Sequence, residues 1–307
     1  MDKWTTENRG PLFGKTALIT RGHEGADLEV TRELFRRGAT VILCTEDITR
    51  GERVMKEIRS TQSSGKMSYV QVDFADLNSV KNFADEFILE HEKLDILIHN
   101  SEISALSERI NSAQGHEMML ARNFLAPFVL TAKLFPLLET AEDGRIIFQS
   151  SVEDSSGVID FFDLDATHYY EAKKAYAQSK LALLMLAKEL DRRIKETYLS
   201  VKSIAIQRSS QDLVSKILSL AMKPNFEAEA FSLLFAATSE EAVSGHYYGG
   251  KGEIHELDTP LQAKNIHAAE KLWSVGEEMG GVEFNLRNLS NILPFQMRGN
   301  IVPELFT

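Results

Sequence analysis

The sequence predicts an α/β protein in which one doubly wound parallel sheet forms a single domain. Short apolar runs alternate with longer segments whose apolar residues recur at helical spacing, from residue 15 to residue 206. This alternation is typical of a parallel sheet covered by helices on both faces. No repeat, low-complexity tract or linker interrupts it. We therefore expect one domain over residues 1–280, followed by a C-terminal tail over residues 281–307.

The expected elements follow one another closely along the chain. Strands are expected where short apolar runs occur, at residues 15–20, 39–44, 67–72, 94–98, 145–149 and 200–206, with an edge strand at 245–249. Helices are expected at residues 24–37, 50–60, 77–89, 117–138, 171–190, 211–221, 226–237 and 264–278. Pro127 lies inside the longest apolar helix, so we expect a bend there.

Composition excludes several classes of function. The net charge of −11 argues against a nucleic-acid-binding surface. The single cysteine, Cys44, excludes an internal disulfide and a cysteine-rich metal site, and it favours a reducing, cytoplasmic location. No run of about 18 apolar residues is present, so no transmembrane segment is expected, and residues 1–15 lack the apolar stretch of a signal peptide.

A tyrosine and a lysine share one face of the helix expected at residues 171–190. Tyr176 and Lys180 are four residues apart, so their side chains lie one above the other. The ammonium group favours the phenolate and lowers a tyrosine pKa that is ordinarily about 10. Such a pair can exchange a proton with an alcohol or a carbonyl compound near neutral pH.

With the strands placed, the chain resembles the short-chain dehydrogenase/reductase superfamily, and within it the retinol-dehydrogenase-like branch, over residues 14–273. Asn123 in RNFLAPFVLT and Ser151 in RIIFQSSVED match two further residues of the family's catalytic tetrad. The resemblance implies a Rossmann-type fold in which Tyr176 transfers the proton and Lys180 lowers its pKa. Ser151 would bind the substrate oxygen, and Asn123 would hold a water molecule that relays protons to Lys180.

The resemblance also implies a nicotinamide cofactor, held by Gly25, Asp73 and Asn100 together with Tyr176 and Lys180. The family's diphosphate-binding turn reads Thr-Gly-x-x-x-Gly-x-Gly, whereas this chain reads TRGHEGAD over residues 20–27. Only Gly25 is in place. Arg21 and Asp27 replace glycines at the helix N-terminus where a diphosphate would bind.

Other family motifs are altered as well. Glu24 and Glu46 stand where NADP-preferring relatives carry basic residues, so any binding should favour NAD over NADP. Binding should also be weak, because Arg21 and Asp27 crowd the diphosphate and Asp27 repels it. Glu46 could alternatively accept a hydrogen bond from a ribose hydroxyl, as an acid does in NAD sites. Glu102 replaces the glycine of Asn-Asn-Ala-Gly, and Gln207-Arg208 replaces Pro-Gly. The substrate lid expected between residues 207 and 226 is short.

Two hypotheses therefore stand side by side. The first is an oxidoreductase that exchanges hydride between a nicotinamide cofactor and an apolar alcohol or carbonyl compound of the retinoid, steroid or lipid aldehyde class. The second is a catalytically inactive family member that serves as a binding or scaffold protein. The run LALLMLA, residues 181–187, is apolar on nearly every side, so it is either buried on both sides or packed against a second copy in a homodimer.

Overall fold

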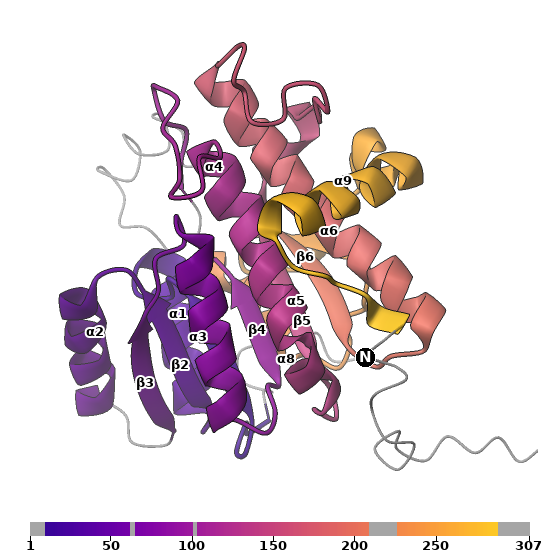
Figure 1. The fold of residues 1–307 in the computed structure, drawn as a ribbon. Coiled ribbons are helices and arrows are strands. Elements are labelled where there is room, and N and C mark those ends of the chain that lie inside the picture. The colour runs from indigo at the N-terminus through magenta and orange to yellow at the C-terminus, as the bar shows by residue number, and fades with distance from the viewer. Residues whose placement is uncertain (1–9, 62–64, 101–102, 209–225, 288–307) are drawn as a thin grey trace, which may run out of the picture.

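One sheet organises the fold (Figure 1). The computed structural model describes residues 10–61, 65–100, 103–208 and 226–287 of the chain. In these residues the strands are β1 (Thr16–Thr20), β2 (Thr40–Thr45), β3 (Lys66–Gln71), β4 (Ile96–His99), β5 (Arg145–Ser151), β6 (Lys202–Arg208), β7 (Tyr247–Gly249) and β8 (His255–Glu256). They run in the order β3-β2-β1-β4-β5-β6-β7-β8, and all neighbours are parallel except β7 and β8. The predicted doubly wound parallel sheet is confirmed.

Helices cover both faces of this sheet. They are α1 (Gly25–Arg36), α2 (Ile48–Thr61), α3 (Leu77–Glu90), α4 (Met118–Leu120), α5 (Ala126–Glu139), α6 (Ala172–Thr197), α8 (Phe226–Thr238) and α9 (Ile266–Gly280). Helices α1, α2 and α8 pack on one face, and α3, α5 and α6 pack on the other. The central strands β4 and β5 are buried along their whole length, whereas the edge strand β3 has one fully buried residue, Met67, and is otherwise exposed or partly exposed. Burial from both sides explains why the central strands read as continuous apolar runs.

The far end of the sheet differs from the expectation. The strand expected at residues 245–249 is not an edge strand, because β7 pairs with β6 on one side and with the antiparallel β8 on the other. The short β8 was not predicted, since two exposed residues carry no apolar pattern. The helix expected at residues 211–221 lies outside the described residues.

The long helix is interrupted just before Pro127. A π-helical turn, η1 (Ala121–Leu125), separates α4 from α5, and Pro127 lies in the first turn of α5. Proline has no N–H to give to the helical ladder, and a wider turn accommodates that loss. Asn123 lies in the middle of this π turn. The predicted bend is therefore a local change of helical geometry at a residue of the candidate site.

Residues 118–139 also form the one helical stretch, among the described residues, that is long and apolar enough to cross a membrane. Its mean hydropathy is 1.3, and 83% of the apolar window is buried inside the fold. The apolar character of this stretch is therefore accounted for by the protein core.

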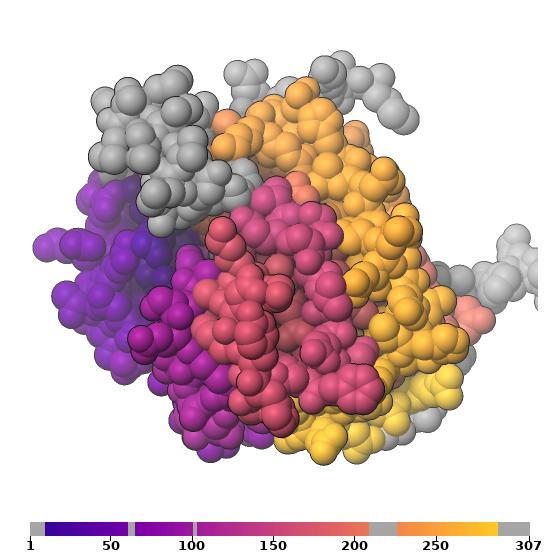
Figure 2. Space-filling view, turned by 90° about the horizontal axis from the view of Figure 1, so that it is seen from above, coloured from indigo at the N-terminus to yellow at the C-terminus, as the bar shows by residue number. Residues whose placement is uncertain are grey.

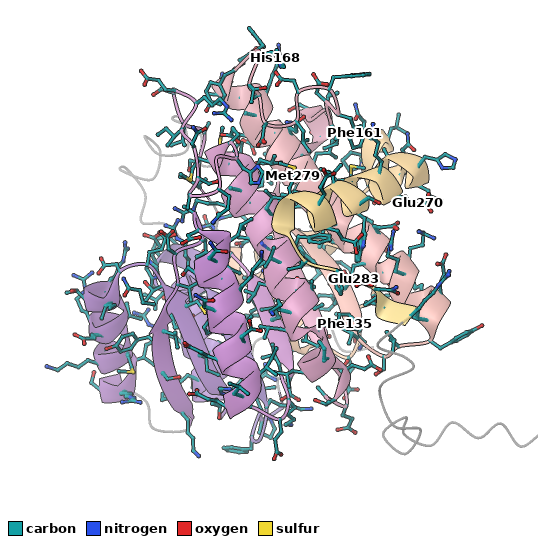
Figure 3. All side chains as sticks on the ribbon, in the orientation of Figure 1. Phe135, Phe161, His168, Glu270, Met279 and Glu283 are labelled. Carbon is teal, nitrogen blue, oxygen red and sulfur yellow. The ribbon has the colours of Figure 1, made fainter. Side chains whose placement is uncertain are left out.

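Helix α9 covers the apolar helices from outside, lying across α5 and α6 (Figures 1 and 3). Every residue of the run 181–187 is buried, none more than 3% exposed. Trp273 of α9 stacks on Phe284 at a ring distance of 4.7 Å and meets Phe128 edge-on at 5.2 Å. The run is thus buried on both sides within one chain, and a homodimer is not needed to explain its composition.

The aromatic contacts of Trp273 should contribute strongly to stability. The side chain is 2% exposed, and the guanidinium of Arg193 lies 4.2 Å from its ring. Trp273→Ala should lower the free energy of unfolding by about 3–5 kcal/mol, because it removes a large packed side chain and leaves a cavity. Chemical denaturation measures this change. Leu261→Ala is the matched control, since Leu261 is 85% exposed, and it should change the free energy by less than about 0.5 kcal/mol.

Candidate functional site

The candidate site lies at the carboxyl edge of the sheet, where the strand order reverses between β1 and β4. Ligands of doubly wound folds bind at such a reversal. Thr20, at the end of β1, links the two strands, because its hydroxyl lies 3.3 Å from the Ile98 carbonyl and accepts a 2.6 Å hydrogen bond from the Asn100 amide. In Figure 2, which views the molecule from above, the indigo and purple residues and the yellow residues lie on opposite sides of the rose segment that follows β5. Thr20, Asn100 and Ser151 lie at this edge, at or just after the ends of β1, β4 and β5.

The turn between β1 and α1 keeps a glycine-type backbone without the family's first glycine. Arg21 has φ +55°, and Gly25 also has φ +55°. A left-handed backbone costs a side-chain-bearing residue about 1–2 kcal/mol and costs glycine almost nothing. Arg21 therefore has the left-handed backbone conformation that suits the family's glycine, although it is not a glycine.

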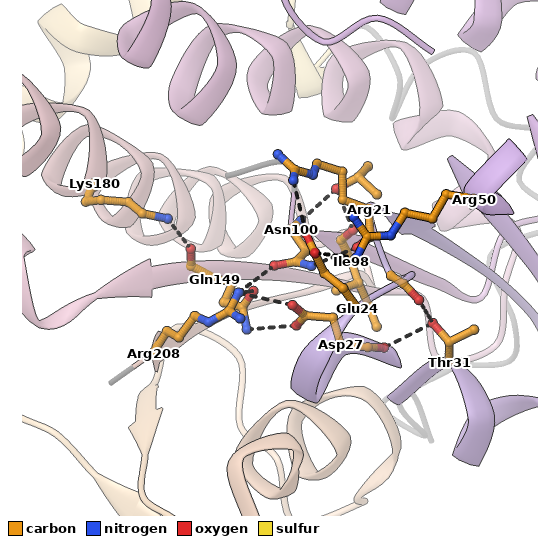
Figure 4. A network of polar contacts seen from close by, with 12 residues as sticks. Arg21, Glu24, Asp27, Thr31, Arg50, Ile98, Asn100, Gln149, Lys180 and Arg208 are labelled. Carbon is orange, nitrogen blue, oxygen red and sulfur yellow. Dashed lines mark hydrogen bonds and ion pairs between the residues drawn. The ribbon is translucent and has the colours of Figure 1, made fainter. Parts of the chain in front are cut away.

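The side chains on the outside of this turn form a charge cluster. Glu24 accepts from Arg21 at 3.2 Å and from Arg50 at 2.6 Å (Figure 4). Partial burial raises the pKa of the Glu24 carboxyl, but the charges of Arg50 and Arg21 outweigh burial, and the net pKa is lowered. The sequence predicted Glu24 as a carboxylate that repels a 2′-phosphate. In the structure its charge is balanced by two arginines.

A second ion pair joins α1 to the end of β6. The Asp27 carboxylate lies 3.0 Å from the Arg208 guanidinium, although 181 positions separate the two residues in the chain. Gln149 donates to Asp27 at 3.3 Å, and the same guanidinium lies 3.3 Å from the Asn100 side-chain oxygen. Figure 4 shows these side chains converging from four elements. Asp27 is 2% exposed and the Arg208 side chain 20%. The sequence marked both residues as departures from the family, but it did not link them.

A third ion pair lies where the resemblance would place the adenosine of a dinucleotide. Glu46, just after β2, lies 2.5 Å from the guanidinium of Arg122. Arg122 belongs to the π turn η1, which precedes α5. The Arg122 side chain is only 10% exposed. Glu46 was expected to accept from a ribose hydroxyl or to repel a phosphate. It is instead paired with Arg122, a residue whose role no sequence motif indicated.

Asp73, the acid expected at the adenine, is exposed just after β3. Its carboxylate accepts a 2.8 Å hydrogen bond from the backbone N–H of Ala75, and its own backbone N–H donates to the Ser79 hydroxyl oxygen at 3.0 Å. These local bonds fix the loop after β3. Asp73 is therefore on the expected edge and open to solvent.

Tyr176 and Lys180 lie on α6, as the spacing predicted. Tyr176 is half-buried, while Lys180 is 1% exposed and donates a 2.9 Å hydrogen bond to the Gln149 carbonyl of β5. The Asn123 side chain accepts a 3.0 Å hydrogen bond from the backbone N–H of Ile103 and donates one of 3.2 Å to the Ile103 carbonyl oxygen. It also donates to the Ser179 hydroxyl at 3.0 Å. This places Asn123 against the turn of α6 that carries both predicted proton-transfer residues.

Ser151 ends β5, and its hydroxyl donates to the carboxylate of Glu153. A hydroxyl group carries one proton, so this bond uses the proton that would otherwise be donated to a substrate oxygen. The carboxylate also opposes a negative charge developing nearby. Glu153 was not predicted from the sequence, although it stands two residues after Ser151. A carboxylate this close to the serine was the available signal.

The resemblance implies that the diphosphate of a nicotinamide dinucleotide would bind at the N-terminus of α1. The buried Asp27 carboxylate lies in the first turn of α1, where a diphosphate would sit. The ring of Phe226 lies 3.7 Å from the position of a Cβ built on Gly25, so the turn is also approached from α8. As arranged, these residues do not fit a diphosphate in the family manner. The described residues contain no group of three or more His, Cys, Asp or Glu side chains that could hold a metal ion.

Comparisons with known proteins agree on one family and one fold. A family model described as short chain dehydrogenase matches residues 15–217, more than half of the chain. Retinol dehydrogenase 12 of Bos taurus is 32% identical over 89% of this chain and 88% of its own length. Retinol dehydrogenase 13 of Homo sapiens is 31% identical over 90% of this chain and 87% of its own length.

Solved structures show the same architecture. An uncharacterized protein from Mycobacterium paratuberculosis superposes with a TM-score of 0.80 at 28% identity, covering 92% of this chain and 99% of that one. The Pseudomonas aeruginosa RhlG/NADP active-site complex superposes with a TM-score of 0.61 at 20% identity, covering 79% of this chain and 96% of that one. The second likeness concerns the fold alone.

His99, at the end of β4, should make the protein sensitive to acid. It is 2% exposed, its Nε2 lies 2.7 Å from the Thr131 hydroxyl, and burial lowers its pKa to about 3. The unfolded chain binds a proton at this histidine below about pH 6.5, whereas the folded chain stays neutral. Stability is therefore lost as the pH falls through 6.5, by about 2 kcal/mol at pH 5.

Denaturation of the wild type and of His99→Gln between pH 7 and pH 5 measures this loss. The variant should lose about 2 kcal/mol less over that interval than the wild type. The same substitution at the exposed His267, which is 98% exposed in its side chain, should leave the pH dependence unchanged. Equal pH slopes for His99→Gln and the wild type would contradict the assignment.

Proposed function

Because the chain belongs to the short chain dehydrogenase family, we propose that it is an oxidoreductase acting on an apolar alcohol or carbonyl compound, with a nicotinamide dinucleotide as hydride partner. The resemblance to the retinol-dehydrogenase-like branch is confirmed by relatives of about 30% identity over about 90% of the chain. The proposed substrate class comprises retinoids, steroids and lipid aldehydes. The observation that carries the proposal is the presence of Asn123, Ser151, Tyr176 and Lys180 on the predicted elements at one edge of the sheet.

The chain's own residues would supply proton transfer and orientation, while the dinucleotide, when bound, supplies the hydride chemistry. Tyr176, which is half-buried, exchanges the proton of the substrate hydroxyl at its phenol oxygen. The buried ammonium of Lys180 favours the phenolate form. Ser151 can donate to the substrate oxygen once its hydroxyl leaves Glu153.

An apolar substrate is supported by the segment that leads into α6. Val158, Phe162 and Tyr169 are 59%, 99% and 67% exposed. The Asp163 carboxylate accepts hydrogen bonds from the backbone N–H groups of Thr167 and Tyr169, so this exposed segment is held in shape. Large, exposed side chains on a shaped segment that leads into the helix of Tyr176 favour an apolar ligand.

We propose a preference for NAD(H) over NADP(H), because Glu24 and Glu46 occupy the positions of basic residues. Both carboxylates are paired with arginines, which reduces their repulsion of a 2′-phosphate. The preference should therefore be several-fold, about 1 kcal/mol, rather than several hundred-fold. A cytoplasmic location is proposed from the single cysteine, and a homodimer remains a proposal that sedimentation at micromolar concentration tests.

A second candidate function is a binding or scaffold role without turnover. The ion pair of Asp27 with Arg208 favours it, since both side chains stand where a dinucleotide would bind. Titration with NADH and NADPH, followed by turnover assays with a retinal, a ketosteroid and a long-chain aldehyde, separates the two functions. Turnover of any of these compounds supports the oxidoreductase. Absence of both binding and turnover supports the scaffold.

Tyr176→Phe should lower kcat about 10²–10⁴-fold, because it removes the hydroxyl group that transfers the proton. The dissociation constant of the dinucleotide should change by no more than a few-fold, since the ring remains. Steady-state kinetics and calorimetry measure the two quantities. Tyr198→Phe is the matched control: Tyr198 is 95% exposed, and the variant should retain wild-type kcat. An active Tyr176→Phe variant would contradict the assignment.

Glu153→Ala should raise kcat several-fold, because it releases the Ser151 hydroxyl and removes a negative charge beside it. Ser151→Ala should lower kcat about 10²-fold, and the double variant should behave like Ser151→Ala. Glu241→Ala, at an exposed glutamate, is the control for loss of charge. A fall in kcat for Glu153→Ala in a folded protein would show that Glu153 assists rather than opposes Ser151.

A further inference from the structure

The pair of Asp27 and Arg208 joins two segments that the sequence motifs treat separately. Asp27 belongs to the first turn of α1 and Arg208 is the last residue of β6. Their contact of 3.0 Å lies at the carboxyl edge of the sheet, and Gln149 of β5 and Asn100, just after β4, make hydrogen bonds to the pair. The ion pair is thus held within a polar cluster and is not an isolated surface contact.

Two positively charged groups at this edge would attract an anion, and the Asp27 carboxylate already lies beside both of them. The N-terminus of α1 carries a partial positive charge that stabilises anions, and the Asp27 carboxylate lies within its first turn. The guanidinium of Arg208 is the second attraction, and it lies 3.0 Å from the same carboxylate. One side chain of the chain itself therefore stands where a bound anion would stand.

We propose that Asp27 is an internal competitor for the diphosphate of a dinucleotide, and that Arg208 is the cation for which the two compete. Binding then requires the guanidinium to turn from the Asp27 carboxylate to the diphosphate. In the free protein Asp27 and Arg208 are paired with each other, and the strength of that ion pair sets the affinity for the dinucleotide. The choice of a dinucleotide rests on the proposed function, whereas the competition rests on the geometry.

The two halves of the pair should have opposite effects on binding. Asp27→Asn raises the net charge of the crevice by one and leaves the guanidinium beside the helix N-terminus, so an anion should bind more tightly. Arg208→Gln lowers the net charge by one and leaves a carboxylate there, so an anion should bind less tightly. A pair with a purely structural role predicts the same direction for both variants, because each breaks the same contact.

Calorimetric titration of the full chain with ADP-ribose and with NADH, at low salt, tests the proposal. ADP-ribose carries the diphosphate without the nicotinamide, so its binding does not depend on hydride chemistry. Asp27→Asn should lower the dissociation constant of both ligands at least 10-fold relative to the wild type. Arg208→Gln should raise it at least 10-fold, and the double variant should lie between the two single variants.

Raising the salt concentration should reduce the advantage of Asp27→Asn, because the gain is electrostatic. The matched control is Glu33→Gln, which removes a carboxylate from the same helix at a position paired with Arg36 on the outer surface. Its dissociation constants should stay within two-fold of the wild-type values. Thermal unfolding of each variant verifies the fold, and Asp27→Ser replaces Asp27→Asn if the asparagine variant does not fold.

The possible results separate the competitor from the proposed function. Tighter binding by Asp27→Asn without any turnover supports the competitor and contradicts the oxidoreductase. Turnover by the wild type, with no tightening in Asp27→Asn, overturns the competitor and leaves the oxidoreductase in place. Changes in the same direction for Asp27→Asn and Arg208→Gln, or no binding by any variant, also overturn the competitor.

Discussion

Burial of the sheet on both faces is the constraint from which the rest of the structure follows. Helices from both sides seal the central strands, so polar side chains within those strands would lose their hydration without compensation. The strand ends are the places where polar groups can be tolerated. Thr20, Gln149 and Arg208 all lie at the carboxyl ends of their strands. The chemistry of the molecule is thereby confined to one edge.

At that edge the chain balances its own charges. Glu24, Glu46 and Asp27 each form an ion pair with an arginine from another segment of the chain. Glu24 forms a second ion pair with Arg21 of its own turn. Charges in a partly buried crevice interact more strongly than charges in water, and an unpaired one costs more. The edge at which the family motif places glycines and basic groups is therefore stabilised in this chain by internal ion pairs. Any anionic ligand has to compete with these pairs as well as with water.

The sequence predicted the order and type of the main elements because apolar periodicity records burial directly. It also placed Tyr176 and Lys180 on one helix, and the structure bears out that placement. It could not connect Asp27 with Arg208 or Glu46 with Arg122, because ion pairs between distant segments leave no local pattern. Each acid was therefore judged alone, as a repulsive group facing a ligand. Its neutralising partner became visible only when the fold brought the strand ends together.

The two-residue strand β8 and the π turn around Asn123 escaped prediction for a related reason. β8 exists through its pairing with β7 and has no apolar signature of its own. The π turn reflects the demand of Pro127 on the preceding residues together with packing against α6. Such features depend on tertiary contacts more than on local propensity.

The position of α9 has a consequence for how the protein is made. Residues 266–287 cover α5 and α6, with Trp273 and Phe284 filling the space between them. These residues follow the sheet and both helices in the chain, so a nascent chain carries the sheet and both helices before their cover exists. During that interval a wide apolar surface faces solvent, where it can be bound by a chaperone or stick to another chain. The cover forms only after residues 266–287 have been made, and a premature stop codon before residue 266 would release an aggregation-prone product.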